Sequence, residues 1–196
     1  TVYYTFMDLH ILITSFSYLA IFILMITNGA FNLPSSQFLY LICGYFISTG
    51  NLLFIPTLIA GATGNTLGNI LTFLLVKKYK KGFARKILMM DEVTFDKLHK
   101  ALHDTFLEKG MWYIFFGKIT PSIKAFIPIL AGLSNTNTKI TSFIFLITSS
   151  IWAVLILSLG YFFGEQFSLQ SFAGVSLLVG LTISYIVYKK ISKKLA

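Results

Sequence analysis

The chain has few charged residues and long stretches with none. Only 12% of its 196 residues are charged, about half the usual share in soluble domains. No Lys or Arg precedes Lys77, and no Asp or Glu stands between Asp8 and Asp91. Because a water-exposed surface needs charge along its length, these gaps exclude a soluble fold. With 56% hydrophobic residues, the composition predicts a polytopic all-α integral membrane protein with a single transmembrane domain, 1–196.

Residues for several kinds of site are also scarce. The single Cys43 excludes an intrachain disulfide. His99 and His103 have the i, i+4 spacing of a metal pair, but the sequence shows no third ligand of matching placement. We therefore expect no metal and no cofactor. The membrane region holds no set of histidine, acid and nucleophile, which argues against an enzyme.

Positive charge is concentrated in two clusters that set the expected topology. The net charge of +9 comes largely from residues 77–86 and 189–194. Both clusters flank apolar runs, so the positive-inside rule places them, and both termini, in the cytoplasm. Nucleic-acid binding is the other interpretation of basic runs, but no soluble platform carries them. We expect a multi-pass protein of the cell inner (cytoplasmic) membrane.

The lengths of the apolar runs predict about four full transmembrane helices and two broken segments. The full spans are expected at about Leu9–Ile26, Leu52–Val76, Ile140–Phe163 and 171–188. The broken segments lie near 28–48 and at 111–132. Their arms of about 10 residues cover only half of a ~30 Å hydrocarbon core, as in a re-entrant hairpin. Between them, residues 77–109 are expected to carry an amphipathic helix on the cytoplasmic surface.

The two hairpins are expected to enter the membrane from opposite sides. This follows from counting crossings between the two cytoplasmic clusters. The chain then has two inverted halves, residues 9–76 and 111–164, followed by a final span. Leu33-Pro34-Ser35-Ser36-Gln37 resembles Thr120-Pro121-Ser122-Ile123-Lys124. Inverted repeats whose broken helices meet at the midplane are a recurring design of transporters.

Two lysines and two prolines share the apolar segment 116–132. Charge in a membrane span is costly and proline breaks a helix, so both are expected where they line a cavity or pathway. Lys118 and Lys124 would form a phosphate site, helped by free backbone N–H groups at the break near Pro121. The alternative is that both lysines snorkel to the cytoplasmic head groups.

The opposite hairpin and the first long span are expected to complete this site. The expected substrate-binding residues are Lys118, Lys124, Pro121, Ser122, Pro34, Ser35, Ser36 and Asn69. Asn28 and Asn32 could face the same cavity, or make hydrogen bonds between helices. Trp152 could wall the cavity or pack in the core.

Glycines recur at the spacing that lets helices approach closely. Gly61, Gly64 and Gly68 have this spacing in one span, and Gly160 and Gly164 have it in another. Helix packing is the favoured interpretation, with backbone contact to a lipid as the alternative.

The residues of the second half resemble a known family. The matching residues are Gly117-Lys-Ile-Thr-Pro121-Ser-Ile-Lys124, Phe126-Ile-Pro128, Ala131-Gly132, Trp152 and Gly160-Tyr-Phe-Phe-Gly164. With Pro34, Gly44 and the glycines of 61–69, they resemble the DedA family (the VTT, or SNARE-associated Golgi protein, superfamily) over about residues 20–165. The resemblance implies paired opposed re-entrant hairpins. It also implies roles in moving or scrambling lipids, including the polyprenyl-phosphate carrier of bacterial envelope synthesis, often linked to proton-motive force.

The chain departs from the family pattern at charged positions. The family usually has arginines where this chain has Lys118 and Lys124, acids where it has Thr27 and Ser36, and an aspartate where it has Asn69. Asn and Ser do not titrate in the relevant range, which argues against proton coupling. Lysine keeps the positive charge but lacks the bidentate fork of arginine. Binding of an anionic head group is therefore better supported than proton coupling.

The leading hypothesis is a lipid transporter, flippase or scramblase for an anionic lipid such as a phospholipid or a polyprenyl-phosphate carrier. Its partners would be membrane lipids and not nucleic acid, and a homo-oligomer is left open. A non-transporting scaffold or homeostasis factor that has lost the coupling carboxylates is the alternative. An ion-coupled carrier of a small soluble anion is a third hypothesis.

Overall fold

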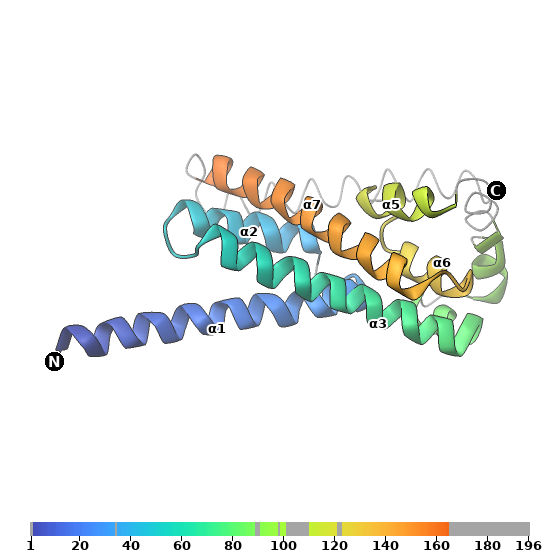
Figure 1. Cartoon of the computed structure of the whole chain (residues 1–196), viewed down its shortest axis with the longest axis horizontal. Helices are drawn as coiled ribbons and strands as arrows, with labels where there is room; N and C mark the ends of the chain where they lie inside the picture. The colour runs from blue at the N-terminus through green and yellow to red at the C-terminus, as the bar shows by residue number, and fades with distance from the viewer. Residues whose placement is uncertain are drawn as a thin grey trace.

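The structure, a computed structural model, describes residues 2–33, 35–88, 91–97, 99–100, 110–120 and 123–164, with the backbone alone over 2–15. These residues form helices and connecting turns and contain no strand, in agreement with the expected all-α class. The helices are α1 Val2–Phe31, α2 Ser36–Ser48, α3 Phe54–Leu88, α5 Met111–Ile119, α6 Ile127–Leu133 and α7 Thr138–Gly164. Figure 1 shows α2 in one half of the bundle and α5 with α6 in the other half.

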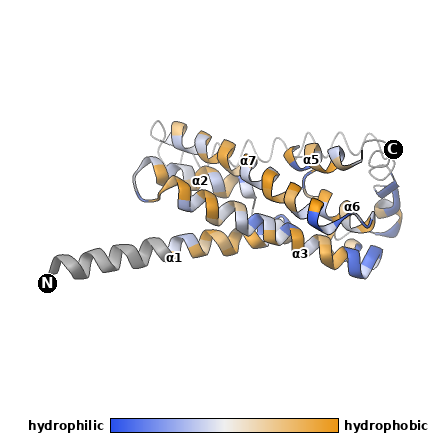
Figure 2. Cartoon of the chain, in the orientation of Figure 1, coloured by the Kyte–Doolittle hydropathy of each residue, from blue (hydrophilic) through white to orange (hydrophobic). Residues whose placement is uncertain are grey.

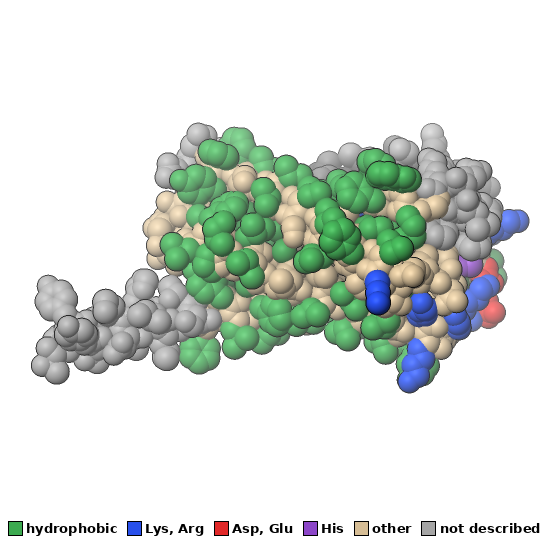
Figure 3. Space-filling view, in the orientation of Figure 1, with side chains coloured by type: hydrophobic (Ala, Val, Ile, Leu, Met, Phe, Trp, Pro, Cys, Tyr) green, Lys and Arg blue, Asp and Glu red, His purple; other side chains and the backbone are tan. Residues whose placement is uncertain are grey.

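Two helices, α3 and α7, are long and apolar enough to cross a membrane. The 27 residues of α7 extend over about 40 Å at 1.5 Å per residue, more than a hydrocarbon core of ~30 Å. Apolar residues dominate α7, whereas α3 becomes hydrophilic at its basic end (Figure 2). Apolar side chains cover most of the visible body, and Lys and Arg gather at one end (Figure 3). Four full spans remain a prediction, and the expected span at 171–188 lies outside the described residues.

The first break in the chain is shorter than the sequence predicts. Residues 28–31, expected in the hairpin, continue α1 as far as Phe31. The helix ends because Asn32 adopts a φ of 58°, the left-handed conformation common just after a helix. Its N–H donates to the carbonyl of Asn28 at 2.7 Å. α2 then begins at Ser36, and its 13 residues cover about 20 Å, less than a full crossing.

The second break separates two short helices. α5 has 9 residues and α6 has 7, so each is much shorter than a crossing. Pro128 lies in the first turn of α6, where the missing N–H costs no helical hydrogen bond. Pro121 and Ser122, in the connection, lie outside the described residues. A re-entrant position for either hairpin stays a prediction.

The helix α3 continues past Val76, the expected end of its span, into the basic cluster. A kink interrupts it at Lys80, which has a φ of 56° and a ψ of −150°. Beyond the kink, Ala84 packs with Phe95 in a small apolar cluster. This explains why the basic segment remains helical: its apolar side is covered by the segment that begins near Asp91 and was expected to be amphipathic. Five residues of the expected apolar face, Leu98, Ala101, Leu102, Thr105 and Phe106, lie outside the described residues.

Glycines bring the two halves of the bundle into close contact. Gly44 of α2 lies against the backbone of Gly160 of α7, and Gly132 of α6 lies against Phe73 and Val76 of α3. An added Cβ at Gly44 would lie 2.6 Å from the Cα of Gly160. The short helix α2 therefore packs on the long helix α7 of the other half, and α6 packs on α3.

The other predicted packing glycines also lie at helix contacts. Gly64 and Gly68 of α3 lie against the backbone of α1, Gly61 lies against the ring of Tyr40, and Gly164 lies against Tyr45 of α2. The prediction of close helix packing at this glycine spacing is confirmed.

Candidate functional site

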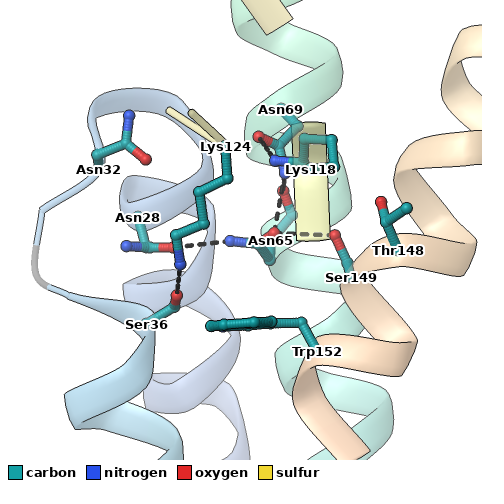
Figure 4. A pocket seen from close by; sticks show the side chains of 10 residues that line it. All are labelled: Asn28, Asn32, Ser36, Asn65, Asn69, Lys118, Lys124, Thr148, Ser149 and Trp152. Atoms are coloured by element: carbon teal, nitrogen blue, oxygen red, sulfur yellow. Dashed lines mark hydrogen bonds between the residues drawn. The ribbon is translucent and has the colours of Figure 1, made fainter. Parts of the chain in front are cut away.

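A polar cavity lies where α1, α2, α3, α7 and the α5–α6 connection meet. Its lining residues are Asn28, Asn32, Ser36, Asn65, Asn69, Lys118, Lys124, Thr148, Ser149 and Trp152 (Figure 4). The cavity volume is about 10 Å³, close to the least that one water molecule requires. The polar groups therefore lie in contact with one another in this state.

Lys118, near the end of α5, is a buried lysine inside this cavity. Its side chain is 7% exposed, and its Nζ donates a hydrogen bond to Oδ1 of Asn69 at 2.8 Å. The Nζ atom also lies 5.5 Å from the centre of the Phe145 ring. Both contacts offset part of the cost of burying the charge. The ammonium group does not snorkel to the surface in this structure.

Lys124 reaches the same cavity from the turn between α5 and α6. Its Nζ donates to Oγ of Ser36 at 2.7 Å and lies 4.9 Å from the centre of the Trp152 ring. Figure 4 shows Lys118 and Lys124 extending into the cavity beside each other, with the flat Trp152 ring lying across its other side. The two positive charges thus share one enclosed space.

A network of amides holds the cavity wall formed by α3. Asn65 is its centre: its Nδ2 donates to Oδ1 of Asn28 at 2.7 Å, and its Oδ1 accepts from Oγ of Ser149 at 2.9 Å. The same Oδ1 accepts from Nδ2 of Asn69 at 2.8 Å. Because the Asn69 amide nitrogen is engaged in this way, its oxygen is turned toward Lys118.

The cavity contains more hydrogen-bond donors than acceptors. An ammonium group carries three N–H donors, and the hydrogen bonds of Lys118 and Lys124 within the described chain use one on each. None of the residues lining the cavity is a carboxylate. Trp152 adds an indole N–H that is buried and has no partner among the described residues. This arrangement suits an anion with several acceptor oxygens.

The structure brings four of the predicted site residues together: Ser36, Asn69, Lys118 and Lys124 all line the cavity. Ser35 does not line it, because its exposed hydroxyl points away and donates to Oε1 of Gln37 at 2.8 Å. The other three predicted residues, Pro34, Pro121 and Ser122, lie outside the described residues.

Sequence reasoning missed three lining residues: Asn65, Thr148 and Ser149. Asn65 could have been found, because it stands four residues before Asn69 and therefore on the same helix face. Ser149 and Thr148 gave no comparable signal, since hydroxyl residues commonly bond to their own helix, as Thr148 does at the Ile144 carbonyl.

Metal-ligating residues do not cluster in the part of the chain that the structure describes. No group of three or more His, Cys, Asp or Glu is close enough to hold a metal ion there. His103, one of the two spaced histidines, lies outside that part.

The comparison with known families identifies the family of the chain. The family model for the VTT domain matches residues 33–162, most of the chain and all cavity-lining residues from Ser36 onward. The chain belongs to the VTT domain family. This is the DedA/SNARE-associated Golgi family that the motifs resemble, and its members are generally transporter-like membrane proteins rather than enzymes. With its long apolar helices, this VTT domain is a membrane protein.

Two curated relatives of this VTT protein come from Lactococcus lactis, and both are named alkaline phosphatase-like protein. The relative from subsp. cremoris (strain MG1363) is 24% identical over 164 residues, which cover 79% of this chain and 74% of the relative. The relative from subsp. lactis (strain IL1403) is 25% identical with the same coverage. No solved structure shows significant similarity to the chain.

Proposed function

We propose that this VTT protein binds the anionic head group of a membrane lipid at Lys118 and Lys124 and moves the lipid between leaflets as a transporter, flippase or scramblase. The observation that carries this proposal is the pair of ammonium groups in one cavity with spare donors and no carboxylate in its lining. A phosphate group, in a phospholipid or a polyprenyl phosphate, offers both negative charge and several acceptor oxygens.

The contacts across the cavity support an inverted repeat centred on this site. Ser36 and Lys124 are 88 residues apart and hydrogen-bond to each other. Asn65 and Ser149 are 84 residues apart and do the same. When equivalent positions of two repeats contact each other, they lie close to the pseudo-two-fold axis that relates the repeats. Transporters with inverted repeats bind their substrates at such an interface.

The packing glycines repeat the same relation. Gly44 and Gly132 are 88 residues apart in the sequence, as Ser36 and Lys124 are. Each of the two glycines lies against the long helix of the opposite half. The residues that they contact, Gly160 and Val76, are 84 residues apart in the sequence, as Asn65 and Ser149 are. We propose two opposed hairpin units, α2 with α3 and α5–α6 with α7, that move against each other during transport.

The small cavity volume requires such a movement. A space of about 10 Å³ holds no more than a water molecule, so a head group enters only when the two hairpins separate. On entering, the phosphate would replace Asn69 and Ser36 as the acceptors for the two lysines. The basic end of α3 is proposed to face the cytoplasm at the inner membrane, with both termini on that side.

Lipid flipping in reconstituted vesicles tests the proposal. Lys118→Gln and Lys124→Gln keep much of the length of the side chain and remove its charge, so each is expected to abolish head-group transfer. Lys81→Gln is the matched control, because Lys81 is a lysine whose side chain is 56% exposed and pairs with Asp96 at the surface. Size-exclusion chromatography verifies folding. Unchanged flipping in both cavity variants would overturn the site assignment.

The same vesicles test the activity suggested by the names of the two Lactococcus relatives. A phosphatase would release inorganic phosphate from a phosphorylated lipid, whereas a transporter leaves the lipid intact. Release of phosphate that depends on Lys118 would favour an enzyme over the transport proposal.

A non-transporting scaffold is the second candidate, and the neutral residues Thr27, Ser36 and Asn69 in place of family carboxylates favour it. Asn69 and Ser36 already accept one hydrogen bond from each lysine without a bound lipid. A scaffold would show no flipping with any variant, while its capture of a partner would depend on the surface segment 91–108. An Asn69→Asp variant that gains flipping under a proton gradient would exclude the scaffold.

A further inference from the structure

An apolar groove runs along the outer side of α5, beside the polar cavity. Its lining residues are Trp112, Tyr113, Phe116, Gly117, Thr120 and Ile123, none of which carries a charge. The groove volume is about 540 Å³, in the range typical of small-molecule sites. Trp112 and Phe116 are 68% and 60% exposed, and their rings stack with centres 6.0 Å apart.

Neighbouring residues of the α5–α6 hairpin line the groove and the cavity. Gly117 lines the groove and the next residue, Lys118, lines the cavity. Ile123 and Lys124 repeat this arrangement. Gly117 and Lys118 are consecutive residues of α5, and consecutive helix residues point about 100° apart, so the groove and the cavity adjoin along this helix.

The shape of the groove also depends on the shared hairpin. At Gly117, the Ile127 side chain of α6 occupies the space where a Cβ would lie. Thr120 lines the groove, but its hydroxyl donates to the Phe116 carbonyl at 2.9 Å, and its own carbonyl accepts from the Lys124 N–H at 3.0 Å. The hydroxyl of Thr120 is therefore engaged within the hairpin, and the other described lining residues of the groove are glycine, aromatic or aliphatic.

We propose that this groove holds the hydrocarbon chain of the same anionic lipid whose head group reaches Lys118 and Lys124. The inference rests on the proposed function and adds a chain-binding subsite to it. A hydrocarbon chain fits a groove of aromatic and aliphatic side chains, and a phosphate at one end fits the adjoining ammonium groups. The lipid is then held at both ends on one structural element, so that movement of the hairpin moves head group and chain together.

Photo-crosslinking of the unmodified full-length protein tests the subsite. The protein is placed in phosphatidylcholine vesicles containing a small fraction of phosphatidic acid with a diazirine in its acyl chain. The parallel sample has the same diazirine chain on phosphatidylcholine. We expect cross-links within residues 112–123 to be more frequent with phosphatidic acid at equal mole fraction. In the double variant Lys118→Gln, Lys124→Gln, they should fall to the level of phosphatidylcholine.

Equal cross-linking by both lipids would overturn the inference and make Trp112 and Phe116 ordinary lipid-facing residues. An absence of cross-links in this segment with either lipid would also overturn it, since the groove would then be covered by protein.

A second measurement separates failure of the subsite from failure of the head-group site. Binding of dihexanoyl phosphatidic acid, which has short chains, is compared with binding of the long-chain lipid in detergent. Phe116→Ala is expected to weaken long-chain binding about tenfold and leave short-chain binding unchanged. Phe143→Ala is the matched control, because Phe143 of α7 is 62% exposed and does not line the groove.

The two sites then give different patterns of failure. If short-chain binding depends on the lysines but Phe116→Ala behaves like Phe143→Ala, only the chain subsite is wrong. If short-chain phosphatidic acid does not bind, or binds equally well without the lysines, the head-group site itself is wrong.

Discussion

The same residue type, lysine, occurs in two opposite environments in this protein. In the central cavity, Lys118 and Lys124 contact neutral oxygens and aromatic rings, with no carboxylate in the lining. At the basic end, Lys81 forms a pair with Asp96 at 2.9 Å, and both side chains are about half exposed. Water and a carboxylate stabilise the charge of Lys81. The charges of Lys118 and Lys124 are stabilised by neutral groups of the protein.

This difference indicates where charge carries function. Exposed ion pairs contribute about 0–1 kcal/mol and are easily replaced. A lysine at the centre of a membrane helix costs about 2.5–3.5 kcal/mol on insertion scales, and two of them in one cavity also repel each other. Such a cost is expected where the charge binds a ligand of opposite sign. The predictions below compare the centre with the basic end.

Removal of both central charges is expected to have the largest effect. The double variant Lys118→Gln, Lys124→Gln should lose about a hundredfold or more in affinity for an anionic lipid, since each charged hydrogen bond contributes about 1.5–3 kcal/mol. Lys81→Gln with Arg85→Gln removes two surface charges and should change affinity by less than about threefold. Native mass spectrometry with phosphatidic acid measures both. Similar losses in the two double variants would mean that overall charge, not the cavity, attracts the lipid.

A Cβ at the contact between α2 and α7 should have the next largest effect. In Gly44→Ala, the new methyl group would clash with the backbone of Gly160, so we expect a destabilisation of about 1–3 kcal/mol. Gly82→Ala, at the basic end, has open space around it and should stabilise the helix by up to about 1 kcal/mol. Thermal unfolding in detergent shows whether each substitution lowers or raises the stability of the protein. A Gly44→Ala protein as stable as the parent would show that α2 and α7 are not held by this contact.

A carboxylate beside Lys118 should compete with the ligand. Asn69→Asp places an acid where the Asn69 oxygen now accepts from Lys118, so we expect the affinity for anionic lipid to fall about tenfold. Asn51→Asp is the control, because Asn51 is exposed and its amide donates to the hydroxyl of Thr49, away from the cavity lining. The binding assay used for the lysine variants applies here. Tighter binding by the Asn69→Asp variant would contradict the picture of an anion held by free ammonium groups.

Breaking a surface pair should have a smaller effect. Glu92→Gln removes the partner of Arg85, and the exposed position limits the expected loss to less than about 1 kcal/mol of unfolding free energy. The loss should shrink further at high salt, because exposed pairs are screened. Thermal unfolding at low and high salt checks this. A larger, salt-independent loss would show that the basic end is held as rigidly as the centre.

The pH dependence of the segment after α3 should be the smallest effect. The backbone N–H of Thr94 bonds to Asp91 and lowers the pKa of that carboxyl group from its ordinary value of 3.8. The stabilisation is therefore present above the ordinary value and disappears as the pH falls through the lowered one. The protection of residues 92–97 from hydrogen exchange, relative to the intrinsic rate at each pH, should be constant near neutral pH and lower in strong acid, and Asp91→Asn should flatten this response. Protection that changes near neutral pH would require another titrating group.

The candidate site was partly predictable from the sequence. Lys118 and Lys124 attract attention as charges in an apolar segment, and the similarity of the two proline segments predicts that the hairpin containing Ser36 faces the hairpin containing Lys124. The structure brings these residues together with Asn69. Asn65 was not predicted as the centre of the amide network: its spacing from Asn69 shows only a shared helix face, and no local pattern links it to its other two partners, Asn28 of α1 and Ser149 of α7.

The helix boundaries were predicted less well than the helix types. The sequence predicts that the first span ends near Ile26 and that a broken segment follows near 28–48. In the structure α1 continues to Phe31, since Gly29 lies against the backbone of α3 and tertiary contact outweighs propensity. The end of α3 shows the same effect, because Phe95 covers the apolar side of the basic segment.

The amino-acid sequence alone determines that this is a helical membrane protein with two broken segments, because apolar length, missing charge and proline act locally and need no partner. It also determines that Lys118 and Lys124 carry charge within an apolar region. Only the tertiary structure decides which way those charges point. Snorkelling and burial are both open to a long lysine side chain. Burial prevails in the structure because Asn69 and Ser36, distant in the sequence, place their oxygens beside the two ammonium groups.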